Sequence, residues 1–178
     1  MSNMNDAFCK LAKLLDYPCE ESREALSSLK ATFSGFDFTA LERTFSDLLR
    51  AQELYTMTFD MRERTTLYIT FYYSGYTRDR GMDLLKLKGL LNKHGISIGN
   101  QAPDFLPVLL RLACSDREGV NVIAKYRQAI ELIHKRLKDE NNPYSAPFEL
   151  LLTLVPESGD ELKVKERPAV ERVGIGDL

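Results

Sequence analysis

The apolar residues of this chain recur at helical spacing along most of its length, and this pattern limits the possible folds more than any other feature. The pattern predicts helices over residues 8–15, 21–31, 39–57, 65–73, 78–94, 105–112 and 116–137, followed by a short one over 148–154. These lengths are ordinary for a globular helical protein. The sequence therefore predicts an all-α protein.

One of these segments is ambiguous. Residues 65–73, with the sequence TTLYITFYY, are rich in β-branched and aromatic side chains, which favour a strand. No second strand-like run exists for this segment to pair with, and a lone strand leaves its backbone polar groups unsatisfied. We therefore expect a buried helix here.

Polar and breaking residues predict where several helices begin and end. Thr39 and Glu42 form a capping box, as do Ser115 and Glu118. Two further predicted caps are Thr77, before residue 78, and Asp104, which would place Pro107 in the first helical turn. The run Lys93-His94-Gly95 predicts a helix end, because cations suit the last turn and glycine suits the left-handed stop.

The composition changes after Pro156. Residues 1–155 hold the predicted helices and are expected to form one helical domain, without internal repeats. Residues 156–178 are rich in charge, proline and glycine, so we expect a tail that is disordered or loosely docked.

Charge and hydropathy exclude several functions. The chain has 178 residues, with 24 Lys and Arg against 26 Asp and Glu, which gives a net charge of −2. A nucleic-acid-binding surface needs a basic excess, so no nucleic-acid partner is expected. No apolar run approaches the length of a membrane span, and residues 1–6 lack the pattern of a signal peptide. We expect a cytoplasmic protein.

The cysteines and histidines indicate neither a disulfide framework nor a metal centre. Cys9, Cys19 and Cys114 are widely spaced and odd in number, while His94 and His134 are isolated. A zinc site would need at least three ligands from unrelated segments, so none is predicted. Recognisable nucleotide-binding and catalytic motifs are also missing from the sequence. We expect no cofactor, and no motif in the sequence supports a small enzyme.

The aromatic residues are concentrated in one stretch. Seven of the 17 Tyr and Phe residues fall between positions 55 and 76. For Tyr68 and Phe71 alone, packing in the core is the ordinary explanation. A single helix cannot point Phe71, Tyr72, Tyr73 and Tyr76 inward together, so some of them should line a surface or a groove.

Charged residues flank this stretch on both sides. Asp60, Arg62, Glu63 and Arg64 precede it, and the run 78–81 follows it. Exposure to solvent is the default for such charges. Arginine–carboxylate pairs within the run 78–81 could alternatively hold a helix junction.

An ordered set of motifs resembles one protein family. The motifs are Tyr55-x-x-x-Phe59-Asp60, Thr66-Leu67, Gly75-x-x-Arg78-Asp79-Arg80-Gly81 and Pro103-Asp104-x-Leu106-Pro107, supported by Leu14-Leu15-Asp16-Tyr17-Pro18 and Tyr144-x-x-x-Phe148-Glu149-Leu150-Leu151. Together they resemble the NarJ-type nitrate reductase assembly chaperones, within the TorD/DmsD class of redox-enzyme maturation proteins. Two places depart from the family: Phe105 stands where His is usual, and Phe71-Tyr72 where Glu-His is common.

The resemblance implies a single-domain helical bundle of the TorD type that is not an enzyme. It also implies a cytoplasmic chaperone that binds the N-terminal, twin-arginine-like leader of the apo catalytic subunit of a molybdopterin-dependent reductase until its cofactor is inserted. Both a monomer and a dimer are compatible with the sequence.

Combined with the aromatic stretch, the resemblance predicts the site. The residues predicted to bind the leader are Tyr55, Phe59, Asp60, Tyr68, Tyr72, Tyr73, Asp104 and Phe105, with the two carboxylates at the rim. Those predicted to build the structural motifs are Arg78, Asp79, Arg80, Gly81, Pro103 and Pro107. Two alternatives remain open: a helical adaptor for another protein, and a small helical enzyme or nucleotide-binding protein.

Overall fold

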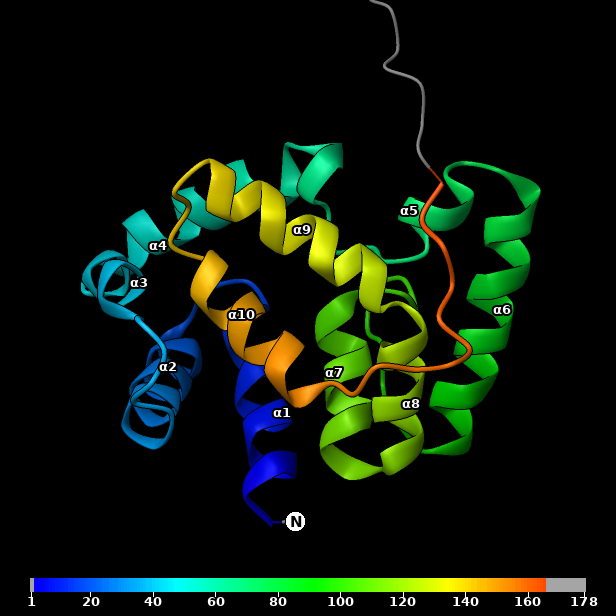
Figure 1. Cartoon of the computed structure of the whole chain (residues 1–178), viewed down its shortest axis with the longest axis horizontal. Helices are drawn as coiled ribbons and strands as arrows, with labels where there is room; N and C mark the ends of the chain where they lie inside the picture. The colour runs from blue at the N-terminus through cyan, green and yellow to red at the C-terminus, as the bar shows by residue number, and fades with distance from the viewer. Residues whose placement is uncertain (1, 166–178) are drawn as a thin grey trace, which may run out of the picture.

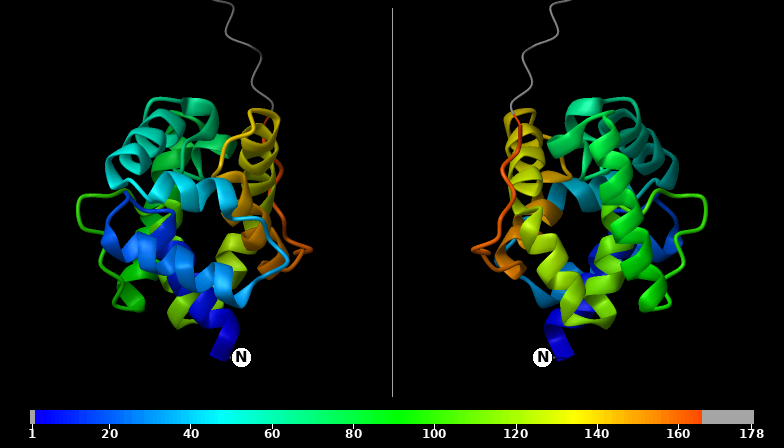
Figure 2. Two further views of the ribbon diagram at one scale, coloured as in Figure 1. Left: turned by 90° about the vertical axis from the view of Figure 1, so that its left-hand side faces the viewer. Right: turned by 90° about the vertical axis from the view of Figure 1, so that its right-hand side faces the viewer.

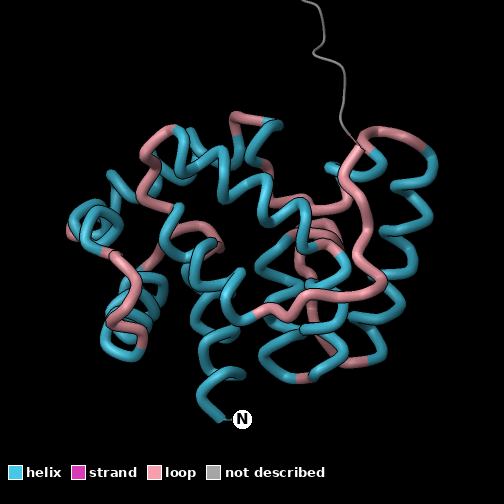
Figure 3. The backbone as a smooth tube through the Cα atoms, viewed as in Figure 1, coloured by secondary structure: helices cyan, strands magenta, loops and turns pink. Residues whose placement is uncertain are grey.

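The structure, a computed structural model, describes residues 2–165. The α-helices are α1 (Ser2–Leu14), α2 (Glu20–Thr32), α3 (Thr39–Phe45), α4 (Leu48–Tyr55), α5 (Phe71–Ser74), α6 (Arg78–Lys93), α7 (Leu106–Ser115), α8 (Arg117–Lys125), α9 (Arg127–Asp139) and α10 (Ser145–Leu154). A π-helical turn, Thr56–Asp60, continues α4, and a 3-10 turn follows at Glu63–Thr65. No strand occurs within residues 2–165, which confirms the all-α prediction (Figure 3).

The core lies where α1, α7 and α10 meet (Figure 1). Helix α7 is apolar on nearly all sides, and seven of its ten residues are buried, as expected for a central helix. Helices α2 to α4 lie on one side of this centre, while α6 and α8 lie on the other (Figure 2). The fold is therefore a bundle around α7 rather than a layered sheet structure.

Helix α8 lies close to α7 at one residue. A Cβ atom added to Gly119 would collide with backbone atoms of Leu112 and Ala113. Glycine at this position therefore permits the two helices to approach each other.

The predicted helix over residues 65–73 is wrong for most of its length. Residues 66–70 lie outside any helix: Ile69 N–H donates to the Asp104 carbonyl at 3.1 Å, and Leu106 N–H donates to the Leu67 carbonyl at 2.9 Å. These bonds flank an isolated bridge between Tyr68 and Phe105. The segment forms backbone hydrogen bonds with residues 104–106, just before and at the start of α7. No helical or strand-like pattern in the sequence predicts this pairing.

Two long predicted helices are each broken. The helix predicted over 39–57 stops at Phe45, and Asp47 caps a new one by accepting from Leu49 N–H at 3.1 Å. The helix predicted over 116–137 breaks at Tyr126, between α8 and α9. In both cases the apolar pattern of the sequence continues across the point where the chain changes direction and a new helix begins.

Several predicted caps also differ in detail. Thr39 lies inside α3 and forms no capping box, while Asp116 rather than Ser115 caps α8. Thr77 precedes α6, but its hydroxyl donates to the Ser74 carbonyl at 2.7 Å instead of capping. The other end of α6 was predicted correctly, since Gly95 has a φ of +67° immediately after it.

The cysteine spacing indicated no disulfide framework, yet two of the three cysteines are bonded to each other. Cys9 of α1 and Cys114 of α7 form a disulfide, while Cys19 is free and exposed. The two bonded residues are 105 positions apart in sequence, so their pairing depends on the packing of α1 against α7.

The chain after α10 lies along the bundle without forming a helix. Leu162 N–H donates to the Lys125 carbonyl at 2.9 Å, and Lys165 N–H to the Tyr72 carbonyl at 3.3 Å. Residues 166–178 of the predicted tail lie outside the described residues. Among the helices of residues 2–165, none combines the length and the apolar character that a membrane crossing requires.

Candidate functional site

Most of the predicted aromatic residues lie inside the protein. Tyr55, Phe59, Tyr72, Tyr73 and Phe105 are all less than 10% exposed. Of the eight residues predicted to bind a leader, Tyr68 is half-buried and Asp60 is exposed. Of the predicted leader-binding residues, the structure therefore leaves only Asp60 and Tyr68 accessible at the surface.

The first part of the aromatic cluster packs in the core. Phe59 contacts Tyr55, Tyr144 and Phe148, with ring centroids 5.1, 4.9 and 6.2 Å away. The Tyr55 hydroxyl donates to the Leu15 carbonyl at 3.1 Å. These rings hold the π-helical turn 56–60 against α10 and α1, and so position Asp60 at the surface.

Tyr72 and Tyr73 act as buried anchors for α5. The Tyr72 hydroxyl donates to the Thr66 carbonyl at 2.8 Å, and the Tyr73 hydroxyl accepts from Ala129 N–H at 3.1 Å. Burial raises the pKa of both phenols well above the usual value, so they remain neutral. Their polar tips are used internally, which attaches α5 to the preceding loop and to α9.

Asp104 neither caps α7 nor lies at a rim. Its side chain is fully buried, and its Oδ2 accepts from the Thr70 hydroxyl at 2.6 Å and from Arg80 Nη2 at 3.2 Å. Phe105 takes the N-cap position of α7 instead, and Pro107 lies in the first turn as predicted. The Asp104–Arg80 ion pair ties the loop before α7 to the start of α6 and to Thr70.

The rest of the predicted structural motif behaves differently from Arg80. Arg78, Asp79 and Gly81 are exposed, and neither Arg78 nor Asp79 forms an ion pair with any residue of the described chain. Pro103 is partly buried beside Asp104. Within the run 78–81, Arg80 supplies the contact that holds the helix junction.

A cleft opens where the π-helical turn, the loop 62–68 and the start of α6 meet. Its volume is about 220 Å³, and its lining residues are Phe59, Asp60, Arg62, Glu63, Thr66, Tyr68, Phe71, Tyr76 and Arg80. Three of them, Phe59, Asp60 and Tyr68, belong to the predicted site. We call this cavity the aromatic cleft.

Both cations that line the aromatic cleft are engaged. Arg62 Nη1 donates to Glu140 at 2.6 Å, and Arg80 is paired with Asp104. Glu63 accepts from the Tyr76 hydroxyl at 2.9 Å. The Asp60 side chain has no hydrogen bond or ion pair with any described residue, and desolvation by neighbouring groups raises the pKa of its carboxyl. The carboxylate of Asp60 is thus available at the mouth of the cleft.

Tyr68 forms the wall of the cleft next to the loop before α7. Its ring lies 5.2 Å from that of Phe105, and its hydroxyl donates to Gln101 Oε1 at 2.8 Å. Phe105, at the position where the resembling family usually has His, thereby supports the wall as an apolar ring.

Sequence reasoning did not assign the cleft residues Arg62, Glu63, Thr66, Phe71 and Tyr76 to the site. Phe71 and Tyr76 were visible in the aromatic stretch, and Arg62 and Glu63 in the charged run before it. Their convergence depends on the non-helical course of residues 66–70 and on the bridge between Tyr68 and Phe105, so a helical interpretation of that segment could not bring them together.

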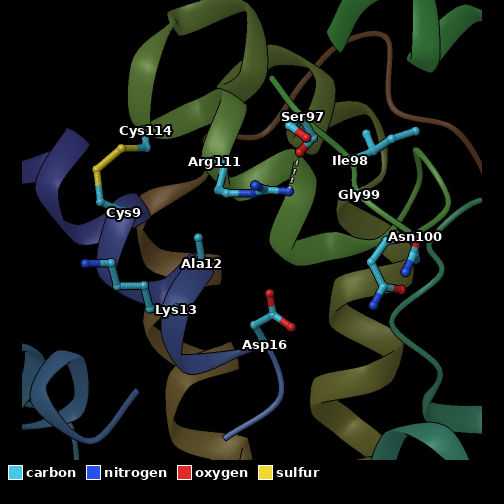
Figure 4. A pocket seen from close by; sticks show the side chains of 11 residues that line it. Cys9, Ala12, Lys13, Asp16, Ser97, Ile98, Gly99, Asn100, Arg111 and Cys114 are labelled. Carbon is cyan, nitrogen blue, oxygen red and sulfur yellow. Dashed lines mark hydrogen bonds between the residues drawn. A yellow bond between two sulfur atoms is a disulfide. The ribbon is translucent and has the colours of Figure 1, made fainter. Parts of the chain in front are cut away.

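A second, larger cavity lies between α1, α7 and the loop 97–101 (Figure 4). Its volume is about 560 Å³, and the Cys9–Cys114 disulfide forms part of its wall. Arg111 crosses it and donates to the Ser97 carbonyl at 2.7 Å, which attaches the loop to α7. No residue of the predicted site lines this cavity, so we treat it separately from the aromatic cleft.

Comparisons with known proteins identify the family. Residues 15–149 match the model of the family described as nitrate reductase delta subunit. The nitrate reductase molybdenum cofactor assembly chaperone NarJ of Escherichia coli K12 is 29% identical over 176 residues, which cover 90% of this chain and 74% of that protein. A probable chaperone of the same description from Bacillus subtilis is 27% identical, over 85% of this chain and 89% of that protein.

The fold has a solved counterpart. A protein described as a redox enzyme maturation protein, from Archaeoglobus fulgidus, superposes with a TM-score of 0.60 at 18% identity, covering 84% of this chain and 92% of that one. At this identity the likeness concerns the fold. It confirms the helical bundle that the sequence predicted.

Together these findings define a helical assembly chaperone rather than an enzyme. The chain belongs to the nitrate reductase delta-subunit family and is of the NarJ type. The resemblance inferred from the ordered motifs is confirmed.

Proposed function

We propose that this protein binds the N-terminal leader of the apo catalytic subunit of a molybdopterin-dependent reductase, nitrate reductase or a related enzyme. It would hold that subunit in the cytoplasm until the molybdenum cofactor is inserted. Relatives named as nitrate reductase molybdenum cofactor assembly chaperones support the client class. The leader contact itself rests on the aromatic cleft.

The observation that carries the proposal is the pairing of apolar walls with an available acid. Phe59, Tyr68 and Phe71 line the cleft with aromatic rings, of which Tyr68 is the most exposed, while the Asp60 side chain is unpaired within residues 2–165. A twin-arginine-like leader presents apolar and cationic side chains together. Such a peptide complements the cleft in both shape and charge.

The size of the cleft limits what it can accept. A volume of about 220 Å³ accommodates one or two side chains, not a folded domain. We therefore expect the cleft to anchor a short segment of the leader, with the arginine of that segment next to Asp60.

Binding of a synthetic leader peptide to the full chain tests this proposal. The peptide is the N-terminal leader of the catalytic subunit of a molybdopterin-dependent nitrate reductase, and its affinity is measured by fluorescence anisotropy. Asp60→Asn and Tyr68→Ala should each weaken binding by about tenfold or more, the effect of losing a charge-assisted contact or a ring contact of about 1.4 kcal/mol.

A matched control removes the same charge nearby. Asp79→Asn changes an exposed carboxylate at the start of α6 that does not line the cleft, so it should leave the affinity unchanged. Equal affinities for wild type, Asp60→Asn and Tyr68→Ala would refute the site. No binding of the leader to the wild type would refute the function, and co-purification with an unrelated protein would favour a general adaptor.

A further inference from the structure

Three metal-ligating side chains converge at the side of the bundle formed by α6 and α8. His94 follows the last residue of α6, Asp116 is the N-cap of α8, and Glu118 lies in the first turn of α8. The ligand atoms of these residues all lie within 4.8 Å of one another. The sequence did not indicate this cluster, because His94 is 22 residues from Asp116 and looked isolated.

The imidazole is the centre of the cluster. His94 Nε2 lies 2.7 Å from Glu118 Oε2, and His94 Nδ1 lies 3.9 Å from Asp116 Oδ2. The His94 side chain is 18% exposed, whereas the two carboxylates are 41% and 44% exposed. The site is therefore held by the protein on one side and open to solvent on the other.

The local structure holds these groups in place before any ligand arrives. Asp116 Oδ1 accepts from Glu118 N–H at 2.7 Å, which orients the carboxylate and turns Oδ2 toward His94. His94 N–H donates to the Leu90 carbonyl at 3.2 Å, and Gly95 then ends the helix. Support of this kind around a ligand set is typical of metal sites.

We propose that His94, Asp116 and Glu118 bind one divalent transition-metal ion of the zinc class, with solvent completing its coordination. One imidazole nitrogen with two carboxylate oxygens is a ligand set for zinc rather than for magnesium or calcium, which prefer oxygen ligands alone. The bound ion would join the end of α6 to the start of α8.

Only small movements are needed to seat the ion. Metal–ligand bonds of about 2.0–2.2 Å in a tetrahedral site place ligand atoms about 3.4 Å apart. The ion would bind a single imidazole nitrogen. If that nitrogen is Nε2, its contact with Glu118, now 2.7 Å, would widen by about 0.7 Å, and the Asp116 carboxylate would turn toward the same nitrogen from within the 4.8 Å that encloses the three ligand atoms. Lys93, now 3.2 Å from Glu118, has a side chain that is 67% exposed and can turn into solvent.

The charge state of the cluster suits a cation. Glu118 and Asp116 place two carboxylates around the imidazole of His94. A divalent ion would balance the charge of both carboxylates.

The proposal is tested by isothermal titration calorimetry, in which zinc chloride is added to the full chain after any bound metal has been removed with a chelator. The titration uses a Cys19→Ser background, because Cys19 is a free, exposed thiol that could bind zinc by itself. We expect saturable binding of one ion per chain and a rise in melting temperature by mass action. Absence of saturable binding in this background would overturn the proposal.

Variants then assign the ligands. His94→Ala should weaken zinc binding at least tenfold and abolish the rise in melting temperature, and Glu118→Gln should weaken it while conserving side-chain size. His134→Ala and Glu24→Gln are the matched controls, because they remove the other histidine and an exposed acid outside the cluster, and both should bind zinc as the background does. Unchanged binding by folded His94→Ala and Glu118→Gln, checked by circular dichroism, would overturn the proposal.

Discussion

Removal of the Cys9–Cys114 disulfide should destabilise this protein by several kcal/mol. The bond closes a loop of 105 residues. In the chain-entropy treatment, a cross-link over a loop of this length lowers the entropy of the unfolded chain enough to stabilise the native state by about 4.7 kcal/mol. Since α1 and α7 already pack extensively without the bond, the native state should change little when it is removed.

Urea unfolding of the double variant Cys9→Ser/Cys114→Ser, followed by circular dichroism, measures this effect. With a denaturant slope of about 2–3 kcal/mol per molar, a loss of 4.7 kcal/mol moves the midpoint down by about 2 M. Reduction of the wild type should produce the same shift. Cys19→Ser, which removes the free thiol, should leave the midpoint in place.

The wild-type midpoint under oxidising and reducing conditions decides whether this reasoning holds. Identical midpoints would mean that the bond does not restrain the unfolded chain, and the entropic account would be refuted. If the double variant unfolded at a lower urea concentration than the reduced wild type, the difference between these two midpoints would be due to the serine substitutions themselves.

Three further outcomes follow from single contacts. Gly119→Ala places a methyl group against the backbone of α7 and should lower the unfolding free energy by about 3 kcal/mol or more. Gly89→Ala, in open space on α6, should raise it by about 0.5–1 kcal/mol. Thermal unfolding of the two variants measures the difference. Arg80→Ala leaves a buried carboxylate unpaired and should cost about 3 kcal/mol in urea unfolding, against less than about 0.5 for the exposed Arg78→Ala. Folding raises the pKa of Asp60, so ionisation of this carboxyl opposes folding. Its contribution to the free energy of unfolding should therefore fall as the pH rises from the unfolded pKa of about 3.9 through the raised folded value. The affinity for the leader should rise over the same pH window, because the carboxylate becomes charged. Asp60→Asn should remove both pH dependences, and their persistence in that variant would contradict the assignment.

The helices themselves were largely predictable from sequence, because their signals are local. The 3.6-residue period of apolar side chains depends on neighbours in the chain, and so does the glycine stop after His94. The end of α6 and the first-turn position of Pro107 in α7 were therefore predicted correctly. The family could also be inferred, because its motifs retain their order along the chain.

The aromatic cleft could be predicted only in part. The density of Tyr and Phe between positions 55 and 76 located the region, but not which rings face outward. Tyr72 and Tyr73 direct their hydroxyls to backbone groups inside the bundle, and Asp104 is enclosed with Arg80. Whether a ring lines a cleft or fills a core depends on what packs against it, and that partner is distant in sequence.

The sequence by itself determined the all-helical class, the approximate places of the helices and the family, since each follows from spacing along the chain. Only the tertiary structure decided that Tyr68 pairs with Phe105 instead of lying in a helix, that Cys9 bonds Cys114, and that His94 meets two carboxylates. Each of these features joins segments that are more than 20 residues apart. Their physical cause is the burial of α1 and α7 against one another and the short distance between the ends of α6 and α8, which local periodicity does not encode.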